Sequence, residues 1–348
     1  MKGTGTRRSL TERKGDLIPL TLRARARESN RRFVKLKKSI ENKADASVLR
    51  RVCIYATGSY GRGEASPASD ADLFLVDTAD HADGRLSNIE QILLRSKLIT
   101  MCRRLGLPEF SGDGEFLAVH CLSDMSKMLG GREDDAVNAF TARLLLLLES
   151  RCLYNGRVYK QAVETFVGEY FRDYEGREDA FLPAFLVNDI VRYWKTVCLN
   201  YEHGRGKRLS ELRRDATLRR EYKLKNLKLK FSRVMTCYSA LATLAWLHRE
   251  GTVTPEDVIK MVSRSPTQRI ADLASAQSAL RDLAVRVLGE YAWFLETLSR
   301  DKASSIKWLS RGSNVAKADR HAQCYRDGFV ELLEAVGREG QLLRYILM

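Results

Sequence analysis

The segment Gly58–Val76 reads GSYGRGEASPASDADLFLV and contains the residues that decide the fold. It follows the short apolar stretch at 52–55 and opens with three glycines and a serine, a composition that predicts a tight turn after a strand. Backbone N–H groups in such turns approach ligands closely, and phosphate is a common ligand. A spacer then leads to Asp70 and Asp72, which begin a second apolar run.

We predict that Asp70 and Asp72 lie on the following strand, where side chains two positions apart point to the same face. Two neighbouring carboxylates are unfavourable unless a cation lies between them. Mg²⁺ fits this position because it prefers carboxylate and phosphate oxygens. Either feature alone is weak evidence, but a glycine turn followed by a carboxylate pair indicates metal-assisted phosphoryl or nucleotidyl transfer.

This combination resembles the signature of the polymerase-beta-type nucleotidyltransferase superfamily, in which GS and a spacer precede DxD and apolar residues. The extended form, GSYGRGE followed by SPASDADL, is similar to the bacterial PII uridylyltransferase-like branch. Two later segments, NDIVRYWKT at 188–196 and LKNLKLKFSR at 224–233, are also similar to that branch, although they are less diagnostic.

The resemblance implies roles for the residues of the motif. Gly58 and Ser59 would hold the triphosphate of a nucleoside triphosphate (NTP or dNTP) at the turn. Asp70 and Asp72 would act in catalysis by binding divalent metal ions, Mg²⁺ or Mn²⁺.

Three further positions follow from the same resemblance. Arg62 and Glu64 occupy the RxE positions, where they would pair to brace the turn or contact phosphate. The superfamily usually has a third carboxylate on a neighbouring strand, as base or metal ligand. We expect Glu115 in this role, at the head of a strand over 115–122, with Asp113 as the alternative. Without such a group, the protein would bind nucleotides without transferring them.

Cationic candidates lie in the helical region. Asn188, Arg192 and Thr196 recur at four-residue spacing and form a polar stripe that indicates either a cleft or a solvent-exposed face. In related enzymes a lysine or arginine from this region neutralises the β- and γ-phosphates. The resemblance therefore implies nucleotide binding by Lys228, with Arg192 as the second candidate.

The predicted architecture is α+β, with a small mixed-sheet nucleotidyltransferase core followed by an all-helical domain. We expect a basic N-terminal helical segment at 1–45, the α/β domain at 46–150 and the helical domain at 151–348. Strand signals nearly vanish after residue 124. Helices are expected over residues 86–105, 134–150, 157–173, 181–201, 208–249, 255–263, 267–299 and 319–347, with one or two more within 17–43.

Composition restricts the class of protein further. The chain has 348 residues, 44% of them hydrophobic, which is sufficient for a sizeable core and suggests two domains. No apolar run approaches the roughly 18 residues of a membrane span, and no apolar segment follows the basic N-terminus as in a secretory signal. The seven cysteines are scattered and never spaced as CxxC, which argues against a disulfide framework and for the cytoplasm.

The positive charge is concentrated in two blocks. Residues 1–51 contain 16 Lys and Arg against 5 Asp and Glu, a net charge of +11. Residues 203–233 contain 12 against 3, a net charge of +9, and the formal net charge of the whole chain is +15. Such blocks indicate a surface that binds nucleotides or nucleic acid, although solvated helices are the alternative.

These observations favour transfer of a nucleoside monophosphate to a hydroxyl group. The basic blocks favour a polyanionic acceptor, either an oligonucleotide or a nucleic acid. Transfer to such an acceptor would give an oligonucleotide product, of the kind that would act as a signal in bacterial phage defence. A protein acceptor, modified with AMP or UMP, is the alternative within the enzyme class. A nucleotide-binding or nucleic-acid-binding module without catalysis is the alternative from another class.

Overall fold

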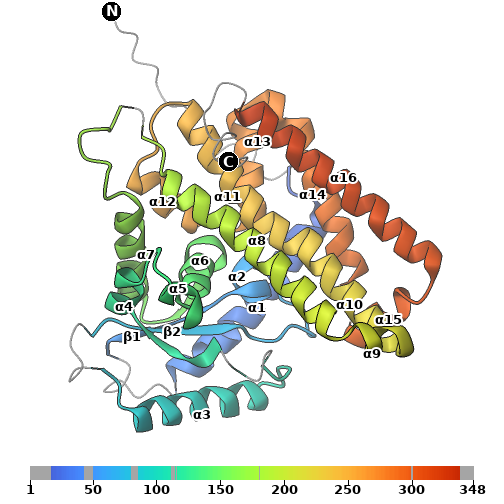
Figure 1. Cartoon of the computed structure of the whole chain (residues 1–348), viewed down its shortest axis with the longest axis horizontal. Coiled ribbons are helices and arrows are strands. Elements are labelled where there is room, and N and C mark those ends of the chain that lie inside the picture. The colour runs from blue at the N-terminus through green and yellow to red at the C-terminus, as the bar shows by residue number, and fades with distance from the viewer. Residues whose placement is uncertain are drawn as a thin grey trace, which may run out of the picture.

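The computed structural model has a small β-sheet at one end and long helices beside it (Figure 1). The structure describes residues 17–42, 50–79, 85–110, 114, 116–179, 181–298 and 301–337. Among the helices in these ranges, none has both the length and the apolar character that crossing a membrane requires. All seven cysteines lie within these ranges and are unpaired.

Four short strands form one mixed sheet in the order β3-β2-β1-β4. They are β1 (Val52–Ala56), β2 (Leu73–Asp77), β3 (Val119–Cys121) and β4 (Arg151–Tyr154). β1 lies antiparallel to both β2 and β4, whereas β2 lies parallel to β3. The third strand is shorter than the predicted 115–122, and β4 was not predicted.

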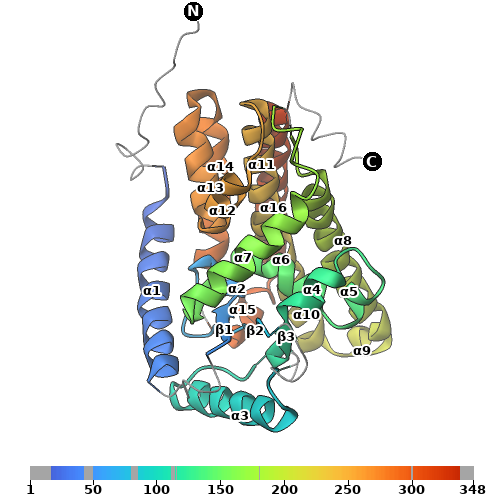
Figure 2. The same ribbon diagram turned by 90° about the vertical axis from the view of Figure 1, so that its left-hand side faces the viewer.

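Helices cover both faces of the sheet, so that every residue of β1 and β2 is buried. Alternate side chains point to opposite faces: Val52 and Ile54 belong to the apolar cluster with α1 and α3, whereas Cys53 and Tyr55 belong to the cluster with α6 and α7 (Figure 2). These helices are α1 (Leu20–Glu41), α3 (Asn88–Arg104), α6 (Ala139–Glu149) and α7 (Gly156–Tyr170). Shorter helices are α2 (Gly58–Arg62), α4 (Leu122–Lys127) and α5 (Glu133–Ala136).

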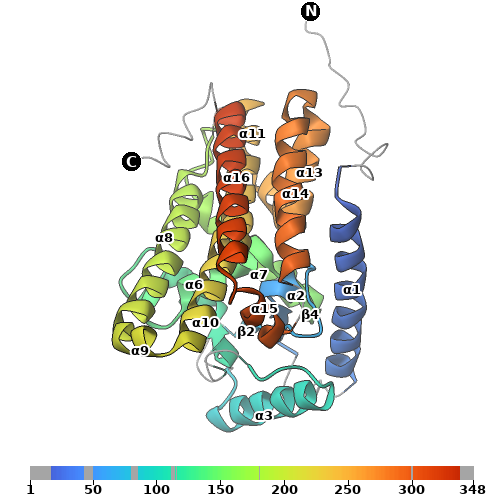
Figure 3. The same ribbon diagram turned by 90° about the vertical axis from the view of Figure 1, so that its right-hand side faces the viewer.

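The remainder of the described chain is helical, with long helices lying side by side (Figure 3). Its elements are α8 (Ala184–Lys207), α9 (Leu209–Arg214), α10 (Ala216–Lys228), the π-helical turn η3 (Leu229–Arg233), α11 (Val234–Arg249), α12 (Pro255–Val262), α13 (Pro266–Ala276), the short 3-10 turn η4 (Ser278–Leu280), α14 (Arg281–Thr297), α15 (Lys302–Trp308) and α16 (Gly312–Gly337).

The single helix predicted over 208–249 is wrong. The chain breaks at Asp215, whose side chain accepts hydrogen bonds from the N–H groups of Thr217 and Leu218 and starts α10. A second irregularity, the π-helical turn η3, separates α10 from α11. The basic stretch at 203–233 therefore spans four helical elements: the end of α8, then α9, α10 and η3.

The predicted fold class is confirmed: a small mixed sheet near the N-terminus precedes a mostly helical part. The larger apolar core continues without a break from Leu17 through the sheet to Val336. This core includes residues on both sides of the boundary expected at 150, so the boundary stays a prediction.

Candidate active site

The glycine-rich turn begins where β1 ends. Thr57 precedes α2, and Gly58 has φ of +60°, a left-handed conformation that residues with side chains rarely adopt. A Cβ atom at Gly58 would lie 2.2 Å from Oδ2 of Asp72. The carboxylate of Asp72 thus occupies the space that a side chain at Gly58 would need.

Asp70 and Asp72 lie just before β2, not on the strand as the sequence predicts. The ladder between β1 and β2 ends at the pair Ala56 and Leu73 because the glycine turn follows β1 directly. One further hydrogen bond continues the alignment, from the Thr57 N–H to the carbonyl oxygen of Asp72 at 2.9 Å. Both aspartates are half-buried at the end of the sheet beside the turn.

Lys228, the last residue of α10, faces the two aspartates. Its ammonium interacts electrostatically with both Asp70 and Asp72. Desolvation by surrounding protein lowers the pKa of Lys228, and the two carboxylates oppose that shift. The side chain nevertheless remains exposed to solvent. The structure therefore brings the predicted lysine and the predicted aspartates together from distant parts of the sequence.

Two further cations lie near the same group. Arg233, at the end of η3, interacts electrostatically with Asp72 and donates a hydrogen bond from Nη1 to Oε1 of Glu149 at 2.6 Å. Lys302 of α15 lies within electrostatic reach of Lys228. Neither Arg233 nor Lys302 was predicted as a site residue, although Arg233 falls within the basic stretch at 203–233.

Arg62 is buried between two carboxylates. Its Nε donates to Oε2 of Glu64 at 2.8 Å, and its Nη1 donates to Oε2 of Glu149 at 2.8 Å. Burial alone would lower the pKa of Arg62, but the two carboxylates raise it well above its usual range. Of the two roles left open by the sequence, bracing of the turn is present in the structure, and the contact with phosphate stays a prediction.

Glu64 continues this network into the helical part. Its Oε1 accepts a hydrogen bond from the hydroxyl of Tyr291 in α14 at 2.8 Å. Burial raises the pKa of Glu64, and Arg62 opposes that shift. The turn is thus fixed both to its own arginine and to a helix more than two hundred residues away in the sequence.

Glu149, the last residue of α6, is absent from the residues predicted from the sequence. Its buried carboxylate accepts hydrogen bonds from the Gly58 N–H, the guanidinium groups of Arg62 and Arg233, and the Thr236 hydroxyl. Burial would raise the pKa of Glu149, but the two guanidinium groups outweigh burial and lower it to about 2. The sequence does contain a signal for Glu149, since it directly follows the five leucines at 144–148. A charged residue at the end of so apolar a helix is expected to be buried and therefore to need a cationic partner.

Arg192, the second cationic candidate, makes other contacts. Its Nη2 donates to Oδ2 of Asp135 at 2.5 Å, and its guanidinium lies 4.0 Å from the ring centre of Phe140. A weaker ion pair joins it to Asp189 at 3.5 Å. Among the described residues, none of these partners belongs to the glycine turn or the aspartate pair, so these contacts do not bring Arg192 to the site.

The two candidates for the third carboxylate, Glu115 and Asp113, lie outside the described residues. Within the part of the chain that the structure describes, no group of three His, Cys, Asp or Glu side chains is arranged to hold a metal ion.

Asp70 and Asp72 nevertheless fit a divalent metal ion that is shared with a ligand. Mg²⁺ is commonly bound by one or two carboxylates together with phosphate oxygens and water. Both side chains are partly accessible, and the buried Thr57 hydroxyl beside them has no hydrogen-bond partner among the described residues.

The comparison with protein families agrees with this geometry. Residues 35–108 match the model described as a nucleotidyltransferase domain, and this range contains β1, the glycine turn, the aspartate pair, β2 and α3. This segment is therefore a nucleotidyltransferase domain of the polymerase-beta-type superfamily.

Domains of this family transfer nucleoside monophosphates from NTP substrates, usually with divalent metal ions. The likeness to the uridylyltransferase-like branch remains a resemblance of the motif. A search of curated proteins finds no match to the chain.

Proposed function

We propose that the protein is a cytoplasmic, Mg²⁺-dependent nucleotidyltransferase that transfers a nucleoside monophosphate from an NTP or dNTP to a hydroxyl group and releases pyrophosphate. The observation that carries this proposal is the contact of the Asp72 carboxylate with Gly58, opposite the ammonium of Lys228. Seven unpaired cysteines support the cytoplasmic assignment.

In the proposed step, the acceptor oxygen forms a bond to the α-phosphorus of the nucleotide. The bond between this phosphorus and the bridging oxygen breaks, and pyrophosphate leaves with the electron pair. The proton of the acceptor hydroxyl passes to a base, for which we propose Glu115, with Asp113 as the alternative.

The remaining residues bind and orient the nucleotide. We propose that Gly58 and Ser59 bind the triphosphate, and that Lys228 and Arg233 balance the charge of the β- and γ-phosphates. When bound at Asp70 and Asp72, divalent ions supply positive charge to the reacting phosphate and lower the pKa of the acceptor hydroxyl. The buried pair of Arg62 and Glu149 holds the turn in place.

We propose a polyanionic acceptor, an oligonucleotide or nucleic acid end. Residues 203–233 contain 12 basic and 3 acidic residues, and this stretch leads to Lys228 at the aspartate pair. Exposed basic side chains on α9 and α10 would attract the phosphates of an incoming strand. We propose that an oligonucleotide product of this kind acts as a signal in bacterial phage defence.

The test is incubation of the purified protein with Mg²⁺ or Mn²⁺ and each labelled NTP and dNTP, with and without oligonucleotide. We expect pyrophosphate release and a product whose mass identifies the donor and the acceptor. The double variant Asp70→Asn/Asp72→Asn should lose at least about a hundredfold in rate, whereas Asp282→Asn/Asp327→Asn, at two exposed positions, should retain it. Equal rates for the two double variants would contradict the assignment, and a labelled protein as the product would identify a protein acceptor instead.

A second candidate function is a nucleotide-binding module without transfer activity. This alternative would hold if neither Glu115 nor Asp113, which lie outside the described residues, supplies a third carboxylate beside Asp70 and Asp72. Nucleotide binding without pyrophosphate release under either metal ion would support this alternative. Loss of activity in Glu115→Gln with binding retained would exclude it.

A further inference from the structure

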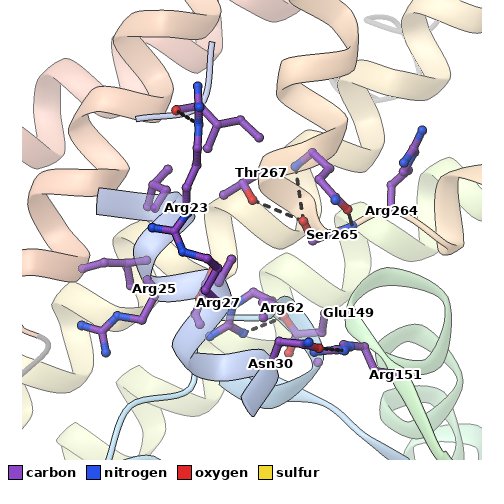
Figure 4. Close-up of a pocket in the computed structure, with 18 of the residues that line it drawn as sticks. Arg23, Arg25, Arg27, Asn30, Arg62, Glu149, Arg151, Arg264, Ser265 and Thr267 are labelled. Atoms are coloured by element: carbon purple, nitrogen blue, oxygen red, sulfur yellow. Dashed lines mark hydrogen bonds and ion pairs between the residues drawn. The ribbon is translucent and has the colours of Figure 1, made fainter. Parts of the chain in front are cut away.

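A cavity of about 490 Å³ lies next to the glycine turn, on the side of α2 that faces α1 (Figure 4). Its walls come from α1, the C-terminal end of α2, the start of β4 and the connection between α12 and α13. Gly58, Asp70, Asp72 and Lys228 are not among its lining residues, so it is distinct from the candidate active site. Its volume falls within the range of about 300–1,000 Å³ that is typical of small-molecule sites.

Arginine dominates the charge of this cavity. Its guanidinium groups come from Arg23, Arg25, Arg27, Arg62, Arg151 and Arg264, and its two carboxylates come from Glu64 and Glu149. Both carboxylates are bound by Arg62, and Arg264 pairs with Asp272 at 3.2 Å. The other four arginines have no carboxylate partner among the residues that the structure describes, so the cavity carries an excess of positive charge.

Arg151 shows most clearly that this charge is poorly compensated. It is half-buried at the start of β4, where its Nη2 donates to the side-chain oxygen of Asn30 at 2.8 Å. Its guanidinium lies 3.8 Å from the ring centre of Phe33. Burial lowers the pKa of Arg151, as expected for a cation that lacks an acidic partner. An anion in the cavity would provide the missing counter-charge.

The remaining lining residues fit a ligand with both polar and apolar parts. Hydroxyl groups come from Ser263, Ser265 and Thr267, whereas the apolar side chains are Ile18, Leu22, Val262 and Leu295. Figure 4 shows the arginines of α1 on one side and Arg264, Ser265 and Thr267 on the other. Arginines suit phosphate groups, the hydroxyl groups suit a sugar, and the apolar side chains suit a base.

We propose that this cavity binds a second nucleotide, separate from the donor, with its phosphates at Arg27 and Arg151. Because Arg62 and Glu149 line the cavity and also hold the glycine turn, the bound nucleotide stabilises the turn from its other side. The proposal does not depend on transfer activity, since binding is measured without it.

The first experiment is calorimetric titration of the full chain with ADP in EDTA, which removes metal-dependent binding at the aspartates. The double variant Arg27→Gln/Arg151→Gln should bind ADP at least tenfold more weakly than the wild type. Arg31→Gln/Arg104→Gln, which removes the same charge outside the cavity, should change affinity less than threefold. Equal loss in both variants, or no saturable binding by the wild type, overturns the proposal. Equal affinity for inorganic pyrophosphate overturns the assignment to a nucleotide.

The second experiment needs no cavity variant. Hydrogen exchange with and without ADP, measured on the Asp70→Asn/Asp72→Asn variant, separates this site from the proposed active site. We expect at least twofold slower exchange in the peptides that cover residues 20–30 and 262–268, which line the cavity and lie away from the donor site. Protection confined to residues 57–64 and 224–233, beside Gly58 and Lys228, would place ADP at the donor site and would overturn the proposal. Protection at 20–30 and 262–268 in a protein without transfer activity would support this cavity even if the proposed function failed.

Discussion

Gly58 is the residue of the turn whose replacement would disturb the aspartate pair directly. A Cβ atom there would meet the Asp72 carboxylate at 2.2 Å, in a backbone conformation with φ of +60°. We predict that Gly58→Ala displaces Asp72 and lowers the transfer rate at least about a hundredfold.

Gly63 provides a matched control. It also has a positive φ, +75°, but no atom lies within 4 Å of a Cβ placed there. Gly63→Ala should cost about 1–2 kcal/mol of unfolding free energy from backbone strain alone and keep most of the transfer rate. Thermal unfolding and pyrophosphate release measure the two effects, and equal loss of rate in the two variants would show that the contact with Asp72 is unimportant.

Glu149 is a buried acid that joins the glycine turn to the helical part of the molecule. Replacing it with glutamine leaves the guanidinium group of Arg233 without its carboxylate and leaves Arg62 with Glu64 alone. We predict that Glu149→Gln costs about 3–5 kcal/mol of unfolding free energy. Denaturant titration measures this cost, and Glu334→Gln, at an exposed position of α16, should change stability by less than about 0.5 kcal/mol.

The same residue predicts a dependence on pH. The pKa of Glu149 falls from 4.5 to about 2 on folding, so the carboxylate stabilises the folded state above pH 4.5. This contribution, on the order of 3 kcal/mol, should be lost as the pH falls from about 4.5 to 2. The difference in unfolding free energy between the wild type and Glu149→Gln should therefore shrink over this window. A constant difference would contradict the assignment.

At the scale of elements, the π-helical turn η3 orients two cationic side chains, those of Lys228 and Arg233. Lys228 lies just before it and Arg233 at its end, and its Phe231 carbonyl accepts a hydrogen bond from Tyr325 at 3.1 Å. The Phe231 ring also stacks on Phe294, with ring centres 4.6 Å apart. π-Helical turns contain one residue more than an α-helical turn and often occur at functional sites.

Deletion of Lys230 should convert η3 to a regular α-helix. Each residue of an α-helix turns the chain by about 100°, so the deletion would rotate Lys228 away from the aspartates. We predict at least a tenfold loss of the transfer rate with unchanged helical circular dichroism. Lys230→Ala, which keeps the turn, should retain the rate, and full activity of the deletion variant would show that η3 does not position Lys228.

Local signals explain which elements could be predicted from the sequence. The helix expected over 255–263 is confirmed as α12, and Thr254 and Asp257 form its capping box, a signal that neighbouring residues provide. The π-helical turn depends on aromatic partners far away in the sequence, so no local pattern indicates it. β4 was missed because Arg151–Tyr154 is very short and gains its order from pairing with β1.

At the scale of the whole molecule, the basic block at 203–233 predicts salt-sensitive binding of single-stranded oligonucleotides. Affinity should fall at least about tenfold between 50 and 200 mM salt, the loss that roughly two to three phosphate contacts with a single strand produce. Arg214→Gln/Arg219→Gln/Lys223→Gln should weaken binding and reduce the salt dependence, whereas Arg311→Gln/Lys317→Gln/Arg320→Gln, on α16 and the turn before it, should not. Fluorescence anisotropy measures both, and equal weakening by the two triple variants would contradict a defined binding surface.

In the candidate site too, residues close together in the sequence could be predicted, whereas contacts between distant segments could not. The glycine turn, Asp70 and Asp72 form one short motif, and they lie together in the structure. Lys228 was inferred from a resemblance, and the packing of α10 brings it to the aspartates. Glu149 could not be predicted with its partners, because its pairing with Arg233 requires the helical part to fold against the sheet.

Glu149 also limits how this protein can exchange parts with its relatives. Its carboxylate bonds to Gly58 and Arg62 on one side and to Arg233 and Thr236 on the other. A chimaera joined after residue 150 would keep Glu149 but take its helical part from a relative. Glu149 would then lose two of its four hydrogen-bond donors, Arg233 and Thr236. Functional hybrids should therefore arise only between parents that share this acid and its distant arginine.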